Sequence, residues 1–117
     1  MTTALFIAVL AAGFDEELAL RRFDAALDLA SNDSLAAEVY LAAGEYAMAA
    51  HLFTLVHEAS GSAGSLLRLW TAVLGDWSDA SRAMPIESAA YRLEGLHPPA
   101  TAAEAAAHDG LYQMHAG

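Results

Sequence analysis

Five histidines are the side chains of this sequence best suited to bind a metal ion. His51 and His57 lie six residues apart, and His108 and His115 lie seven apart, a spacing of about two helical turns and about 10 Å of rise. A helical zinc pair needs histidines four residues apart, and the chain has no cysteine to complete such a site. The sequence therefore predicts no metal site and no cofactor.

Residues that support covalent or phosphate chemistry are absent or lie in the wrong context. All five cationic residues are arginines, which excludes lysine Schiff bases and a phosphate loop with its lysine. The glycines of segment 61–64 follow a predicted helix rather than a strand, and no serine lies in a Gly-x-Ser-x-Gly element. Glu16 and Glu17 point to different sides of a predicted helix, in polar surroundings. We predict no catalytic site and no enzymatic activity.

Composition predicts a single all-α domain. The 117 residues carry fifteen acidic and five basic side chains, and this net charge of −10 argues against nucleic acid as a partner. With 56% hydrophobic residues the chain is too apolar to be a disordered acidic segment. Alanine fills 29 positions, and no stretch alternates between apolar and polar residues with a period of two.

The start of the sequence has an apolar run from Ala4 to Ala12 that is similar to the core of a signal peptide. No basic residue precedes it, and Asp15, Glu16 and Glu17 follow it closely. The run is also about half as long as a membrane-spanning helix. We expect a buried helix here, no membrane contact and a cytoplasmic protein.

Glycine and proline divide the chain into eight predicted helices. Gly13, Gly44 and Gly75 are predicted turns between helices, and Thr101 with Glu104 forms the pattern of a capping box. The predicted helices cover residues 3–12, 15–30, 34–43, 45–60, 65–74, 77–83, 87–93 and 101 onward.

An internal repeat of 31 residues links two of these turns. Glycine, an aromatic residue, alanine and a large apolar residue recur at the same four offsets, first as Gly44, Tyr46, Ala49 and Phe53 and then as Gly75, Trp77, Ala80 and Met84. Glycine permits a tight turn, and the small alanine allows two antiparallel helices to approach closely. A looser copy begins at Gly13, so each unit is predicted to be a helical hairpin.

With Tyr40 before the first of these turns, the pattern resembles the tetratricopeptide repeat. The resemblance implies about three tetratricopeptide-like antiparallel hairpins over residues 3–30, 34–60 and 65–84, with capping helices over 86–117. The chain departs from that family in its shorter period, in a missing closing proline, and in Thr71, which replaces an aromatic residue.

In length and layout the chain also resembles the small chaperones of type III secretion needle subunits. That resemblance implies a non-enzymatic protein whose apolar concave groove clamps an amphipathic helix of the needle subunit and prevents its premature assembly. It also implies a small helical co-chaperone as a second partner. A generic tetratricopeptide adaptor and a self-contained structural or homo-oligomeric helical domain remain as alternatives.

The repeat register predicts which side chains line the groove. Inward positions lie two, three, six and ten residues before each turn glycine, with Thr3, Ser34 and Ser65 on the polar rim. The predicted partner-binding residues are Ile7, Leu10, Ala11, Glu38, Leu41, Ala42, Leu69, Ala72 and Val73. The opposite face, with Leu5, Val9, Tyr40, Leu67 and Trp70, is assigned to the internal core. In the alternative arrangement, residues 87–114 fold back and fill the groove.

Overall fold

The computed structural model describes residues 13–116. All regular structure in this part of the chain is helical, which confirms the predicted all-α class. Residues 13–19 form a helical segment. The later helices are α2 (Phe23–Leu29), α3 (Asp33–Ala42), α4 (Tyr46–Ser60), α5 (Ala63–Ala83), α6 (Ile86–Leu96) and α7 (Ala102–Ala116). None of the described helices is both long and apolar enough to cross a membrane.

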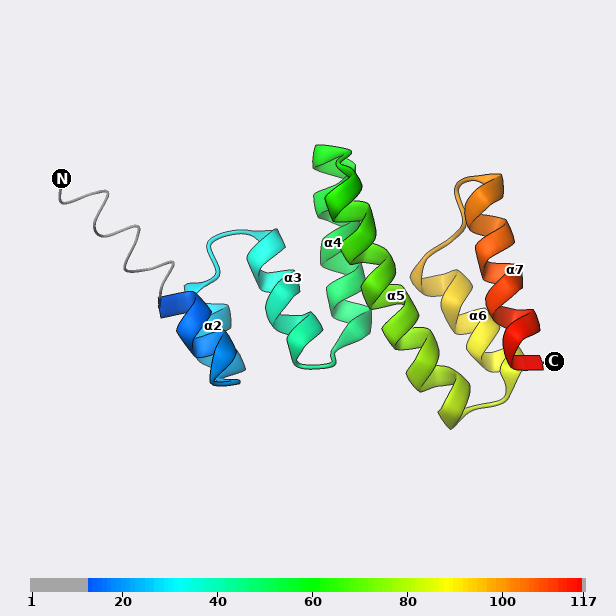
Figure 1. The fold of residues 1–117 in the computed structure, drawn as a ribbon, viewed down its shortest axis with the longest axis horizontal. Coiled ribbons are helices and arrows are strands. Elements are labelled where there is room, and N and C mark those ends of the chain that lie inside the picture. Colours follow the sequence, from blue (N-terminus) through cyan, green and yellow to red (C-terminus); the bar gives the residue numbers. More distant parts are fainter. Residues whose placement is uncertain (1–12, 117) are drawn as a thin grey trace.

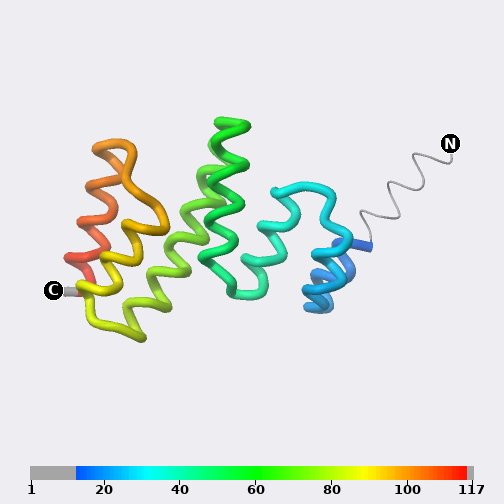
Figure 2. Tube along the Cα trace, turned by 180° about the vertical axis from the view of Figure 1, so that it is seen from behind, coloured from blue at the N-terminus to red at the C-terminus, as the bar shows by residue number. Residues whose placement is uncertain are grey.

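The helices stand side by side in chain order, so that each one packs mainly against the helices next to it in the sequence (Figure 1). From behind, the trace again runs from α2 at one end of the row to α7 at the other (Figure 2). In this arrangement α5 lies between α4 and α6, and α7 packs at the end of the row against α6.

Local sequence explains most of the helix boundaries. Asn32 caps α3 by accepting a hydrogen bond from the backbone N–H of Leu35 at 2.9 Å. Gly44 makes the turn into α4 with a φ of +79°, a conformation in which glycine carries no steric penalty. Half of the predicted capping box is present: Thr101 accepts a hydrogen bond from the N–H of Glu104 at 3.1 Å, and the Thr101 hydroxyl donates to Glu104 Oε1 at 3.4 Å.

The predicted turn at Gly75 is wrong. α5 runs without a break from Ala63 to Ala83, and Gly75 lies inside it. The helices predicted for 65–74 and 77–83 are therefore a single helix, and the 31-residue repeat does not produce a hairpin over 65–84. A glycine inside a helix costs only about 1 kcal/mol relative to alanine, which the packing of neighbouring helices can offset.

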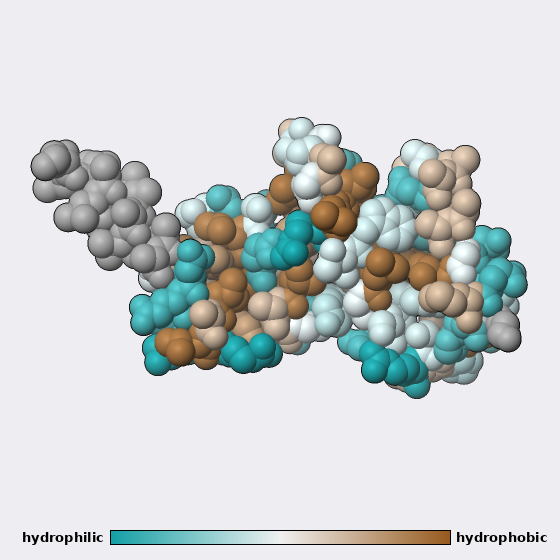
Figure 3. All heavy atoms as spheres, in the orientation of Figure 1, coloured by the Kyte–Doolittle hydropathy of each residue, from teal (hydrophilic) through white to brown (hydrophobic). Residues whose placement is uncertain are grey.

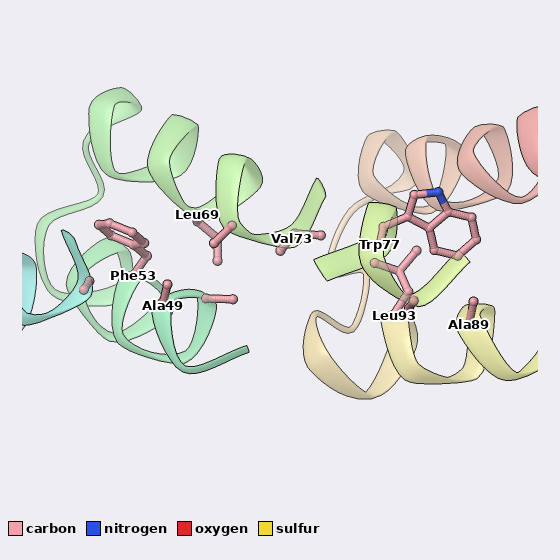
Figure 4. Packing of buried hydrophobic residues seen from close by; sticks show 11 residues of the cluster. Ala49, Phe53, Leu69, Val73, Trp77, Ala89 and Leu93 are labelled. Carbon is pink, nitrogen blue, oxygen red and sulfur yellow. The ribbon is translucent and has the colours of Figure 1, made fainter. Parts of the chain in front are cut away.

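The main core lies between α4, α5 and α6, with one contribution from α3 (Figure 4). Phe53, Leu69, Val73, Trp77 and Leu93 are its large side chains, and each is at least 95% buried. The rest of this cluster is alanine, which allows the helix backbones to approach closely: Ala37, Ala49, Ala50, Ala72, Ala80 and Ala89. Burial of each large side chain is worth about 1.5–3 kcal/mol. A smaller cluster of Phe14, Ala26 and Val39 joins the first described helices to α3.

Candidate binding surface

The structure places the predicted groove residues in three different environments. Ile7, Leu10 and Ala11 lie outside the described residues. On α3, Leu41 is half-buried against the main core, Ala42 is exposed, and Glu38 is half-buried beside Arg68. These α3 residues do not form an apolar surface.

The third predicted set lies in the core. Leu69 is 2% exposed, and Ala72 and Val73 are fully buried between α4 and α6. On the same helix Leu67, which we assigned to the core, is 68% exposed. Trp70, which we also assigned to the core, is half-buried and packs against it, so the predicted register of α5 fails at Leu67, Leu69, Ala72 and Val73 but holds at Trp70.

The outward face of α5 and the neighbouring end of α7 border a groove, which we call the α5–α7 groove. It has a volume of about 280 Å³ and is lined by Leu74, Trp77, Ser78, Ser81, Leu111, Met114 and His115. Leu74 is 44% exposed and Met114 is 73% exposed, and Leu67 extends this apolar face toward the start of α5. Figure 3 shows hydrophobic side chains over the region of α5 and beside it. Exposed apolar patches of this kind mark sites of protein association.

Ion pairs between helices fix the orientation of α5. Arg92 on α6 donates hydrogen bonds to both carboxylate oxygens of Asp76, at 2.9 Å and 2.6 Å, and Asp76 is only 5% exposed. The hydrogen bond and the charge of Asp76 raise the pKa of Arg92. Arg68 makes a similar two-point contact with Glu38 on α3. These pairs join α5 to α6 and to α3.

The chain is strongly acidic, because fifteen acidic side chains stand against five arginines. Four of the five arginines form ion pairs: Arg22 with Glu17, Arg68 with Glu38, Arg82 with Asp79 and Arg92 with Asp76. All fifteen acidic residues lie within residues 13–116, and subtracting these four leaves eleven that have no arginine partner in that part of the chain. A partner with basic residues flanking its apolar contacts would complement this field.

A cluster of rings joins α7 to the rest of the molecule. The Trp70 ring centroid lies 5.1 Å from that of His97 and 5.9 Å from that of His108, both edge-on. His97 Nε2 lies 2.5 Å from a carboxylate oxygen of Glu104, while both ring nitrogens of His108 are buried without a hydrogen-bond partner. Burial, followed by the proximity of His97, lowers the pKa of His108. Sequence spacing gives no signal for this cluster, because Trp70 and His108 are 38 residues apart.

The histidines do not assemble a metal-binding group in this part of the chain. Within residues 13–116, no three histidine or acidic side chains come together in an arrangement that could hold a metal ion. Comparison of the chain with protein-family models, with curated proteins and with solved structures yields no match.

Proposed function

We propose that the chain is a non-enzymatic protein-binding module that holds an amphipathic helix of a partner in the α5–α7 groove. The observation that carries this proposal is the exposure of Leu67, Leu74 and Met114 around a groove between two helices. A helix as long as α5 extends about 30 Å, enough to meet a partner helix over several turns. The partner would insert apolar side chains at positions i, i+3, i+4 and i+7.

The acidic surface favours a partner helix with lysine or arginine beside its apolar stripe. Opposite charge across an interface mainly accelerates association and rejects partners of like charge. The resemblance to needle-subunit chaperones supports a chaperone role, in which the groove covers the helix of a secreted subunit until assembly. A small helical co-chaperone would then be a second partner. If the chain is instead a generic tetratricopeptide-like adaptor, it would use the same surface to bind a helix of another protein.

A second candidate function uses the same exposed residues. Leu67, Leu74 and Met114 could be covered by another copy of the chain, which would make the groove part of a homo-oligomer. The solution mass separates the two proposals. A module that binds a partner is expected to be monomeric alone, whereas an oligomer built on this groove dissociates when Leu74 is changed to Asp.

The direct test measures binding of a fluorescein-labelled 18-residue peptide with a leucine stripe and lysines on its other face. Leu74→Asp and Met114→Asp are expected to weaken binding by about tenfold or more, because each buries a carboxylate against an apolar stripe. Leu55→Asp on α4 is the matched control, since Leu55 is 42% exposed and lies outside the groove.

A second control is the same peptide with glutamate in place of lysine, which should bind more weakly to the acidic chain. Circular dichroism establishes that each variant keeps its helical content. Equal binding by the Leu74→Asp and Leu55→Asp variants would overturn the assignment of the groove.

A further inference from the structure

α7 has one buried side chain among those that the structure describes, and its half-buried Leu111 packs against the main core. Among the α7 side chains that the structure describes, only His108 is buried, at 8% exposure. Glu104, Leu111 and Tyr112 are half-buried and the others are exposed. The one buried side chain in the described part of α7 is therefore a titratable group.

His108 occupies a site that suits the neutral imidazole and opposes the charged one. Its two ring nitrogens are buried without hydrogen-bond partners, and its ring packs against those of Trp70 and His97. A protonated ring would place a charge and two unpaired N–H donors in this environment. Movement of α7 away from α5 and α6 would expose these donors to water.

The ionisable groups around His108 come from α6 and α7. His97, just after α6, disfavours a positive charge on His108, whereas Glu94 and Glu104 favour one. Burial is the largest influence, and α5 contributes only the uncharged ring of Trp70. A cavity of about 380 Å³ bordered by His108, Glu94, Asp109 and Tyr112 brings solvent close to the imidazole.

We infer that His108 is a pH-dependent latch that holds α7 against α5 and α6 while it is neutral and releases α7 when it is protonated. Release removes Leu111 and Met114 from the α5–α7 groove, so a helix bound there dissociates as the solution becomes acidic. The latch itself follows from the burial of His108, whereas dissociation of a partner rests on the proposed function.

The direction of the effect follows from the lowered pKa of His108 in the docked state. A histidine released from this site returns to an ordinary pKa of about 6.5. The docked state is therefore fully stable above about pH 6.5 and loses stability as the pH falls below that value. Because one proton is linked to release, the equilibrium constant for docking of α7 falls by up to about tenfold for each pH unit below that value, until the pKa of the docked state is reached.

The test uses the full chain and follows α7 by two methods between pH 7.5 and pH 5.5. Hydrogen exchange, corrected for the intrinsic effect of pH, should show loss of protection in α7 but not in α4. The only two tryptophans, Trp70 and Trp77, lie against His108 and His115 respectively. Their emission should shift to longer wavelength as α7 leaves, and they should become more accessible to acrylamide.

His108→Leu keeps an apolar anchor and removes the proton, so α7 of this variant should stay docked at pH 5.5. His51→Leu, at an exposed position on α4, is the matched control and should respond to pH like the wild type. The same loss of α7 protection in His108→Leu as in the wild type, or no loss in the wild type, would overturn the latch. If the His108→Leu variant does not fold, the wild type provides a second test. An NMR titration of the His108 ring must then show protonation over the same pH range in which α7 loses protection.

Binding of the lysine-containing peptide at the two pH values separates the latch from the proposed function. The latch predicts weaker binding at pH 5.5 in the wild type and unchanged binding in His108→Leu. If α7 responds to pH but the peptide binds at neither pH, the latch stands and the proposed function falls. If the peptide binds equally at both pH values and α7 stays docked, the latch falls alone.

Discussion

The ring of Tyr46 on α4 packs directly against the backbone of α5 at Gly75. A Cβ atom at position 75 would lie 2.6 Å from the nearest carbons of that ring, closer than side-chain atoms approach one another. Gly75 therefore serves helix packing rather than a turn. Gly75 is followed in α5 by Asp76, which pairs with Arg92 on α6, so α5 contacts α4 and α6 through two consecutive residues.

Gly75→Ala is therefore expected to destabilise the fold even though alanine favours a helix. The methyl group must displace the Tyr46 ring, and overpacking of this kind costs about 1–3 kcal/mol. Gly95→Ala is the matched control, because Gly95 also lies inside a helix and has nothing within 4 Å of an added Cβ. That substitution should stabilise the chain by about 0.5–1 kcal/mol. Urea unfolding measures both free energies, and a stabilising Gly75→Ala would contradict the packing argument.

Gly44 and Gly75 explain why the fold was only partly predictable from the sequence. Both are followed by an aromatic residue, an alanine and a large apolar residue at the same offsets, yet Gly44 forms a turn and Gly75 lies inside a helix. In the structure Tyr46 on α4 packs against position 75 on α5, and a contact of this kind between two helices leaves no trace in local spacing. Turn chemistry was predictable at Thr101, where the capping partner is only three residues away.

The position of the exposed apolar residues on α5 was not predictable from the sequence. An apolar face in excess of the core is visible in the sequence of α5, but which of its two apolar sides becomes buried depends on the helices that flank it. The burial of Leu69 and the exposure of Leu67 reverse the expectation for these two residues. The ring cluster of Trp70, His97 and His108 was not predictable, because its members come from separate elements.

The register of α5 can be tested with two leucines that are two residues apart. Leu69→Asp places a carboxylate in the main core and should cost several kcal/mol, at least about 3, a large fraction of the roughly 5–15 kcal/mol that stabilises a typical domain. Leu67→Asp replaces a side chain that is 68% exposed and should change the free energy of unfolding by less than about 0.5 kcal/mol. Thermal unfolding followed by circular dichroism compares the two. If Leu67→Asp were the variant that unfolds, α5 would have to be rotated about its axis relative to this structure.

Replacement of Arg92 should lower the free energy of unfolding, because Asp76 is buried and loses its ionic partner. Arg92→Met keeps the aliphatic part of the side chain but leaves a carboxylate that is 95% buried without its ionic partner. We expect a loss of about 1–3 kcal/mol, because an unpaired buried charge costs more than the pair contributes.

Arg82→Met is the control for this substitution, since the Arg82 pair with Asp79 is exposed and lies within one helix. Its effect should be at most about 0.5 kcal/mol. Asp76→Asn combined with Arg92→Met should recover part of the loss, because the amide removes the unpaired charge. Urea unfolding of the wild type, Asp76→Asn, Arg92→Met and the double variant forms a double-mutant cycle, and additive effects would show that the two side chains are not coupled.

Salt should weaken binding of the lysine-containing peptide mainly by slowing its association. Eleven acidic side chains have no arginine partner within residues 13–116 and act at a distance on an approaching cation. Raising the ionic strength from about 0.05 M to about 0.5 M shortens the screening length to a few ångströms, which removes this attraction. Stopped-flow fluorescence should show an association rate that falls by about tenfold or more and a dissociation rate that changes little. The glutamate-containing peptide should show the opposite trend, because salt screens its repulsion from the chain. An association rate independent of salt for both peptides would mean that the apolar groove alone selects the partner and that the acidic surface has no part in recognition.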